Sequence, residues 1–142
     1  MDWKEILSQH GYRLSEPRKR IMKLLANTET ALGPQQIHQQ LQGSNKIGLV
    51  SVYRTLDLLL ELGLVTVVYD SQHNPGYMLG TIGHHHHIVC QNCSKALEFS
   101  GSDDINELVL RVEKETAFKV RDHILQLFGL CPECQKTLPQ RA

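Results

Sequence analysis

The chain of 142 residues has no apolar run that approaches the roughly 20 residues needed to span a membrane. Its first residues, Met1 to Glu5, lack the basic and then apolar segments of a secretory signal peptide. The formal net charge is zero, so the chain is not the strongly basic domain that would by itself identify a nucleic-acid-binding protein. With 41% apolar and 21% charged residues, we expect a folded cytoplasmic protein with no membrane partner.

Enzyme signatures are also lacking. The H-E-x-x-H motif of metalloproteases does not occur, and neither does the H-x-E motif of zinc deaminases. No phosphate-binding loop or Ser-His-Asp signature is present. We therefore expect neither enzymatic activity nor a small-molecule substrate.

Cysteine is scarce, and all of it occurs in two Cys-x-x-Cys pairs. In a reducing cytoplasm such pairs bind metal more often than they form disulfides, and zinc accepts four thiolates in a tetrahedron. The alternative, a pair of redox dithiols, is disfavoured because neither pair follows the strand-to-helix pattern of a thioredoxin-like site. We predict structural zinc at Cys90, Cys93, Cys131 and Cys134.

A run of four histidines directly precedes the first cysteine pair. Alternate side chains of a strand point to opposite faces, so each face would carry two imidazoles about 7 Å apart, close enough to share one metal. A solvated polar patch is the alternative. We predict a second divalent metal, with one candidate site at His85, His87 and Glu98, and another at His84, His86 and His123 with Asp103 or Glu107.

The sequence of the N-terminal half predicts helices followed by a hairpin. Helix starts are expected at Asp2, Ser15 and Gly33, and a fourth helix is expected over 49–62. The β-branched run 64–69, a turn and a short second strand follow. Residues 1–63 hold eight Lys and Arg against six Asp and Glu, with the basic excess in 13–23. This order predicts a winged helix-turn-helix.

The fourth helix is the one placed to enter a DNA major groove. Its first turns carry Ser51, Tyr53, Arg54 and Thr55, which can contact phosphates or base edges. A winged helix used for protein contact is the alternative. We expect double-stranded DNA as the partner.

The C-terminal half predicts a small α/β unit of order β-β-α-β. The expected strands are 84–89, 96–99 and 118–128, with a helix after Ser102. The predicted fold class is α+β, with a winged-helix domain over 1–80, a hinge over 81–84 and a metal-binding dimerisation domain over 85–142, stapled by the four-cysteine zinc site. A unit this small gains little from hydrophobic burial, so zinc should matter for its folding.

These motifs resemble the ferric uptake regulator (Fur) superfamily over nearly the whole chain. The resemblance is carried by Gly48 to Arg54, by the histidine run with its Cys-x-x-Cys, by Glu98-Phe99, and by His123 ahead of the second cysteine pair. It implies a homodimer whose regulatory metal closes two DNA-binding domains onto a palindromic operator and represses transcription. It also implies that Tyr53 and Arg54 contact DNA, with Arg13 and Arg18 on the backbone.

The branch of the superfamily stays open. Ala31 and Met78 stand where the iron- and peroxide-sensing branches usually have a histidine and an acid, and Gly80 stands where the zinc-sensing branch commonly has a cysteine. A histidine-dominated site suits zinc or nickel, and we favour zinc, as in the zinc-sensing (Zur-like) branch. The alternatives are iron, nickel or peroxide sensing, or redox regulation with structural zinc alone. Asp70 and His73 are candidate hinge-side ligands.

Overall fold

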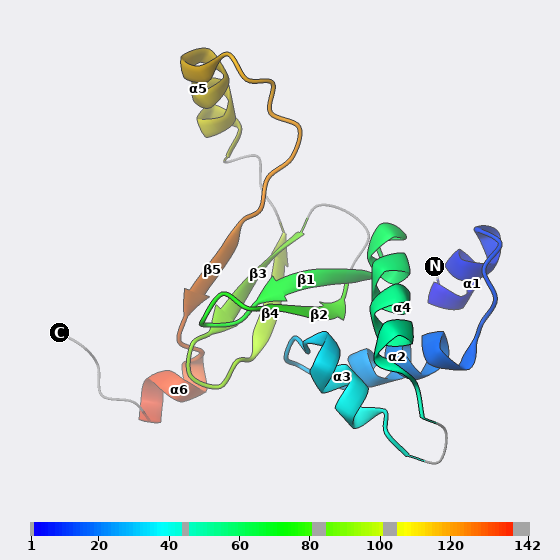
Figure 1. Ribbon diagram of the computed structural model, residues 1–142. Helices are drawn as coiled ribbons and strands as arrows, with labels where there is room; N and C mark the ends of the chain where they lie inside the picture. The colour runs from blue at the N-terminus through cyan, green and yellow to red at the C-terminus, as the bar shows by residue number, and fades with distance from the viewer. Residues whose placement is uncertain (1, 44–45, 81–84, 101–104, 138–142) are drawn as a thin grey trace.

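The computed structural model describes residues 2–43, 46–80, 85–100 and 105–137. The expected hinge at 81–84, together with His84 and Asp103, lies outside the described residues. The N-terminal part contains four helices and a hairpin (Figure 1), namely α1 (Trp3–Gln9), α2 (Glu16–Ala26), α3 (Pro34–Gln40), α4 (Leu49–Glu61), β1 (Val65–Tyr69) and β2 (Pro75–Leu79). This is the predicted winged helix-turn-helix.

Local sequence explains where these helices begin. The Asp2 side chain accepts a hydrogen bond from the Lys4 amide at 3.4 Å, which caps α1. The amide of Gly33 donates to the Gln36 side chain at 2.8 Å, and Pro34 occupies the first turn of α3, where its missing N–H costs nothing. Gly63, at φ 74°, ends the α4 region in a left-handed conformation that favours glycine.

One large apolar core holds the winged helix together. Each of its helices contributes at helical spacing, and α4 presents Val52, Leu56 and Leu59, all fully buried. The hairpin adds Leu64 and Val65 at its base. Burial on this scale is the main stabilising term for a domain of this kind.

The C-terminal part has a three-stranded sheet of order β4-β3-β5. Its elements are β3 (His85–Cys90), β4 (Ala96–Ser100), α5 (Asn106–Thr116), β5 (Gln126–Gly129) and α6 (Pro132–Thr137). Strand β3 is central, antiparallel to β4 and parallel to β5. The α+β class and the β-β-α-β order are confirmed, and α6, which carries Cys134, is an addition that the sequence reading did not include.

The last strand is much shorter than predicted. Only Gln126–Gly129 pairs with β3, whereas residues 118–125 form a connection that leads from α5 back to the sheet. The predicted strand over 118–128 is therefore wrong for most of its length. β-branched and aromatic residues favour an extended backbone, but a strand also needs a neighbour for its hydrogen bonds. Among the described residues no strand pairs with 118–125, although the His123 ring lies near that of His86.

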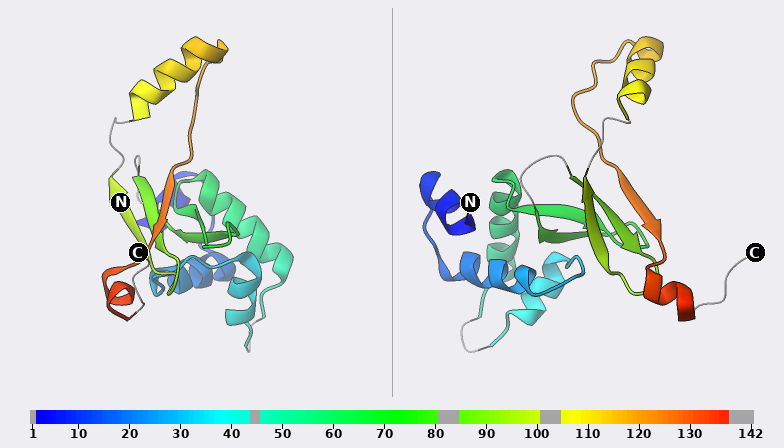
Figure 2. Two further views of the ribbon diagram at one scale, coloured as in Figure 1. Left: turned by 90° about the vertical axis from the view of Figure 1, so that its left-hand side faces the viewer. Right: turned by 180° about the vertical axis from the view of Figure 1, so that it is seen from behind.

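Helix α5 stands clear of both sheets in every view (Figure 1 and Figure 2), and none of its described residues is buried. Leu110 is 66% exposed, and Phe118 just beyond the helix is 74% exposed. An amphipathic helix with an uncovered apolar side is normally covered by another surface.

A second, smaller core joins the two parts of the chain. Val68 of β1 packs against Val89 of β3 and Ala96 of β4, with Met78 and Phe128 at the margin. The wing and the C-terminal sheet therefore meet face to face (Figure 2).

Candidate metal centres and DNA-binding surface

The two cysteine pairs converge at one end of the C-terminal sheet. Cys90 ends β3, Cys93 lies in the turn that follows, and Cys131 and Cys134 lie at the start of α6 and within it. Their four sulfur atoms lie within 4.8 Å of one another, and the Cys93 and Cys131 sulfurs are 3.8 Å apart. A tetrahedron of thiolates about 2.3 Å from zinc has edges of about 3.8 Å, so the sulfurs fit a zinc ion.

Backbone amides prepare these thiols for a cation. The amides of Cys93 and Cys131 point at the Cys90 sulfur at 3.5 and 3.4 Å, and the Asn92 side chain donates to the Cys134 sulfur at 3.2 Å. The hydrogen bond from the Cys93 amide is the main cause that lowers the pKa of Cys90 to about 6. A lowered pKa favours the thiolate form of Cys90, which is the form that binds metal.

The pKa of Cys131 is shifted in the opposite direction. The Cys134 amide lowers its pKa, but the crowded thiols of Cys134, Cys93 and Cys90, together with burial, raise the pKa of Cys131 to about 12. Four thiolates this close repel one another unless a cation sits among them. The second pair does follow a strand and open a helix, so the expectation that neither pair has this pattern is wrong. The convergence of all four sulfurs nevertheless favours a divalent metal over a free dithiol pair.

His85, His87 and Glu98 lie on one face of the sheet. Strand register pairs His87 with Glu98, and the His85 Nδ1 atom lies 3.2 Å from a Glu98 carboxylate oxygen. The same face carries Val89, which packs against the wing, so the expected triad faces the winged helix. His87 is buried, and burial is the main cause that lowers the pKa of His87. Its imidazole is therefore neutral at pH 7, the form that binds metal.

The opposite face brings two other predicted ligands together. The rings of His86 and His123 are 5.3 Å apart, and His86 also lies 5.7 Å from the ring of Phe99. His123 reaches this position from the connection before β5, not from a strand as predicted. Glu107 lies on α5, which stands apart (Figure 1). Within the described ranges, only the four cysteines form a group of three or more potential ligands within 4.8 Å.

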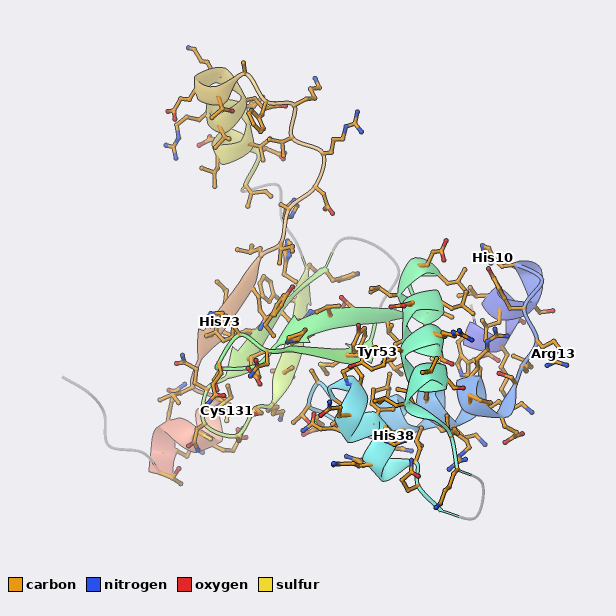
Figure 3. The ribbon with its side chains drawn as sticks, viewed as in Figure 1. His10, Arg13, His38, Tyr53, His73 and Cys131 are labelled. Carbon is orange, nitrogen blue, oxygen red and sulfur yellow. The ribbon has the colours of Figure 1, made fainter. Side chains whose placement is uncertain are left out.

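The candidate hinge-side ligands are engaged elsewhere. Asp70 accepts hydrogen bonds from the amides of Gln72 and Asn74 at 2.9 and 2.8 Å and so closes the wing turn. His73, at the wing tip beside β5 (Figure 3), stacks on the ring of Phe128 at 5.0 Å. Ala31 and Met78 pack against the smaller core.

The polar side chains of α4 divide between two faces. Ser51, Tyr53 and Arg54 are exposed, and Tyr53 lies between α3 and the wing (Figure 3), where it lines a hollow with Gln36 and Pro75. Thr55 is only 7% exposed and shares the buried face with Val52 and Leu59, so it offers little surface for the DNA contact predicted for it. Arg54 and Thr55 differ in this way because successive side chains of an α-helix point about 100° apart, and Thr55 falls on the side that Val52 and Leu59 bury.

The expected backbone contacts lie at the other end of the winged helix. Arg13 is exposed in the connection between α1 and α2 (Figure 3). Arg18 donates to the Arg13 carbonyl at 2.7 Å and lies over the ring of Tyr12 at 5.4 Å. The sequence reading did not single out Tyr12, although an aromatic residue close to arginines is a signal for such stacking.

No helix in the described part of the chain is long and apolar enough to cross a membrane. Fold and sites together define a winged-helix protein with a separate metal-binding α/β unit.

The chain belongs to the ferric uptake regulator family, whose model matches residues 9–128. Members of this family are metal-responsive transcriptional regulators and not enzymes. The chain is 32% identical over 135 residues to the ferric uptake regulation protein of Campylobacter jejuni, covering 93% of this chain and 85% of that one.

Solved structures of similar proteins share the fold of this chain. The Helicobacter pylori ferric uptake regulator, described as having three functional metal binding sites, is 28% identical with a TM-score of 0.61, over 93% of this chain and 88% of that chain. A zinc uptake regulator complexed with zinc and DNA shares the fold at 21% identity with a TM-score of 0.77, over 94% of this chain and 91% of that chain. Relatives named for iron and for zinc both match, so the specific metal is not determined.

Proposed function

We propose that this protein is a cytoplasmic, metal-dependent transcriptional repressor that binds a palindromic DNA operator as a homodimer. The observation that carries the proposal is the placement of His85, His87 and Glu98 on the sheet face that packs against the winged helix. A ligand influences a conformational equilibrium only through its differential affinity for the two states. A metal on this face can therefore bias how the winged helix sits, and hence DNA affinity.

Zinc is the metal that we propose for both the cysteine site and the regulatory site. Two imidazoles and one carboxylate form a donor set that zinc accepts, and nickel or iron(II) are the alternatives. His84, His86 and His123, with Asp103 or Glu107, are proposed as a further site. On the DNA side, the proposal retains Ser51, Tyr53 and Arg54 of α4, with Arg13 and Arg18 on phosphates.

The homodimer is proposed from the uncovered apolar surfaces of the C-terminal part. Leu97, Leu127 and Ile88 are 53%, 47% and 38% exposed and share the sheet face opposite the wing. With residues 1–80 as the DNA-binding domain, 81–84 as the hinge and 85–142 as the dimerisation domain, a two-fold dimer would present two copies of α4 to two half-sites.

The test begins with an operator selected from random-sequence DNA by the zinc-loaded protein. Protein stripped by mild chelation of all but its tightly held zinc is then titrated with zinc, iron(II), nickel and manganese in separate anisotropy experiments. We expect one metal to strengthen binding roughly 5- to 150-fold, the usual range of such coupling. That metal identifies the branch.

A matched pair of variants locates the switch. His85→Ala/His87→Ala should lose most of the metal response while keeping the fold, whereas His38→Ala, on α3, should keep the response. An unchanged response in the double variant would refute the regulatory role of these histidines.

Redox regulation is the second candidate, because Cys93 is an exposed thiol and the pKa of Cys90 is lowered to about 6. It predicts DNA binding that is independent of added metal and is lost with peroxide as zinc is released. Metal-dependent binding that survives peroxide would exclude it.

A further inference from the structure

The wing and the C-terminal sheet are joined by a side chain to which the proposed metal chemistry assigns no role. The Tyr69 amide donates to the Gln126 side-chain oxygen at 2.9 Å, and the Gln126 amide nitrogen donates to the Tyr69 carbonyl at 2.6 Å. The Gln126 side chain thus makes two hydrogen bonds with the backbone of Tyr69, 57 positions away in sequence. The backbone of a neighbouring strand would make the same pair of bonds.

The hairpin does not use the N–H and C=O of Tyr69, so both can bond outside it. Asp70 donates to the Asn74 carbonyl across the hairpin at 2.9 Å, so the preceding residue, Tyr69, directs its N–H and C=O away from β2. Its partner in the β1–β2 register is Pro75, which has no N–H to offer. Strand β1 therefore presents an unfilled edge at Tyr69, and Gln126 fills it.

The rest of the contact includes the rings of His73 and Phe128, whose centroids lie 5.0 Å apart. Val68, Val89 and Ala96 form its apolar base, and the Ala96 amide donates to the Glu29 carbonyl at 3.0 Å. A cavity of about 160 Å³ lined by Ala31, Tyr69 and other residues of both parts lies beside it. Gln126 adds two hydrogen bonds between the two parts of the chain to these contacts, so its loss should weaken the junction.

Gln126 also adjoins the candidate regulatory histidines. It is the register partner of His87 in the parallel β3–β5 pair, so both side chains lie on the face toward the wing. Among the described residues, no winged-helix side chain completes a three-ligand cluster with these histidines. The Gln126–Tyr69 hydrogen bonds therefore join the two parts of the chain directly beside these histidines.

We propose that Gln126 is a positioning residue that latches the winged helix onto the C-terminal sheet through the backbone of Tyr69, and so holds α4 in place before DNA is bound. Preorganisation of this kind raises affinity because less freedom is lost on binding. The DNA part of this inference rests on the proposed function, whereas the latch itself does not.

The latch is tested on the full-length, zinc-loaded protein without DNA. Amide exchange at Tyr69 is followed by NMR in the wild type, in Gln126→Ala and in the similarly sized Gln126→Glu, whose second carboxylate oxygen would face the Tyr69 carbonyl. Gln42→Ala is the matched control, because the Gln42 amide donates to the His38 carbonyl at 2.7 Å inside the winged helix. We expect exchange at Tyr69 to accelerate about tenfold in both Gln126 variants and not in the control.

The second readout is the orientation of the winged helix relative to the C-terminal sheet, which a merely local contact would not change. Residual dipolar couplings should fit one alignment tensor for both parts of the wild type and two for Gln126→Ala. An unprotected Tyr69 amide in the wild type, or a single tensor in both Gln126 variants, would overturn the latch.

DNA affinity at fixed metal concentration completes the test. We expect Gln126→Ala to bind the selected operator about tenfold more weakly, with the metal response of the C-terminal site retained. Accelerated exchange with unchanged affinity would overturn the positioning role. If the wild type binds no DNA with any metal, the proposed function fails, and the exchange and alignment data still decide the latch.

Discussion

The two parts of this chain reach a stable fold by different means. The winged helix buries apolar side chains from all of its helices in one core, including fully buried Leu7, Ile21 and Leu56. The C-terminal part has a small core shared with the wing, four clustered cysteines, and a helix with no buried residue. We therefore expect the first part to depend on its own hydrophobic burial, and the second to depend on metal and on surfaces outside itself.

Zinc removal should separate the two parts most strongly. Cys93→Ser removes one ligand of the four-sulfur site, and structural zinc contributes on the order of 10 kcal/mol to small domains. We expect the β3–β5 sheet to lose its dispersed NMR signals while the signals of α1 to α4 persist. Gln91→Ala, an exposed residue of the same turn, should leave the zinc content at one ion per site. A folded, zinc-free sheet in Cys93→Ser would contradict the comparison.

The cysteine site was the part of the structure most completely foreseen from sequence, and the reason is local. Each Cys-x-x-Cys places two sulfurs on one turn, so only the meeting of two turns had to be inferred. The helices of the winged helix were foreseen for a similar reason, since caps and apolar spacing are local signals. The histidine faces followed from the strand period.

What escaped prediction depends on contacts between distant segments. The stretch 118–125 has strand-like residues, but among the described residues no strand pairs with it. Thr55 is a different case, because its place on the buried side of α4 follows from helical spacing with Val52 and Leu59. The Gln126–Tyr69 ring joins residues 57 positions apart and has no sequence signature. Neither composition nor periodicity specifies such partners.

The burial argument for the winged helix is tested within one helix. Leu56→Ala removes a fully buried side chain of α4 and should lower the free energy of unfolding by about 3 kcal/mol. Leu60→Ala, on the same helix but 39% exposed, should cost less than about 1 kcal/mol. Urea denaturation followed by the helical circular dichroism signal measures both. Equal costs at the two positions would show that the core does not carry the stability of this part.

A charged substitution tests whether the C-terminal part associates with a second copy of the chain. Leu127→Asp places a carboxylate on the sheet face that Ile88 and Leu97 share, and it should weaken self-association by roughly 10- to 100-fold. The matched control is Leu60→Asp, which adds the same charge to an exposed leucine of the winged helix. Sedimentation velocity measures the dimer fraction. Equal dimer fractions in the wild type and Leu127→Asp would place the interface elsewhere.

The smallest effect concerns the wing turn, where the winged helix relies on a charge instead of burial. The hydrogen bond from the Asn74 amide is the main cause that lowers the pKa of Asp70 from 3.8. A lowered pKa in the folded state means that the stabilisation is present above the unfolded pKa and is lost as pH falls through the folded value. Asp70→Asn keeps an acceptor oxygen for the turn but cannot titrate. The wild type should therefore lose its small advantage over Asp70→Asn as the pH falls below about 4 in urea denaturation. A constant difference across that range would show that the Asp70 charge does not stabilise the turn, and that the wing, like the rest of its domain, is held by burial alone.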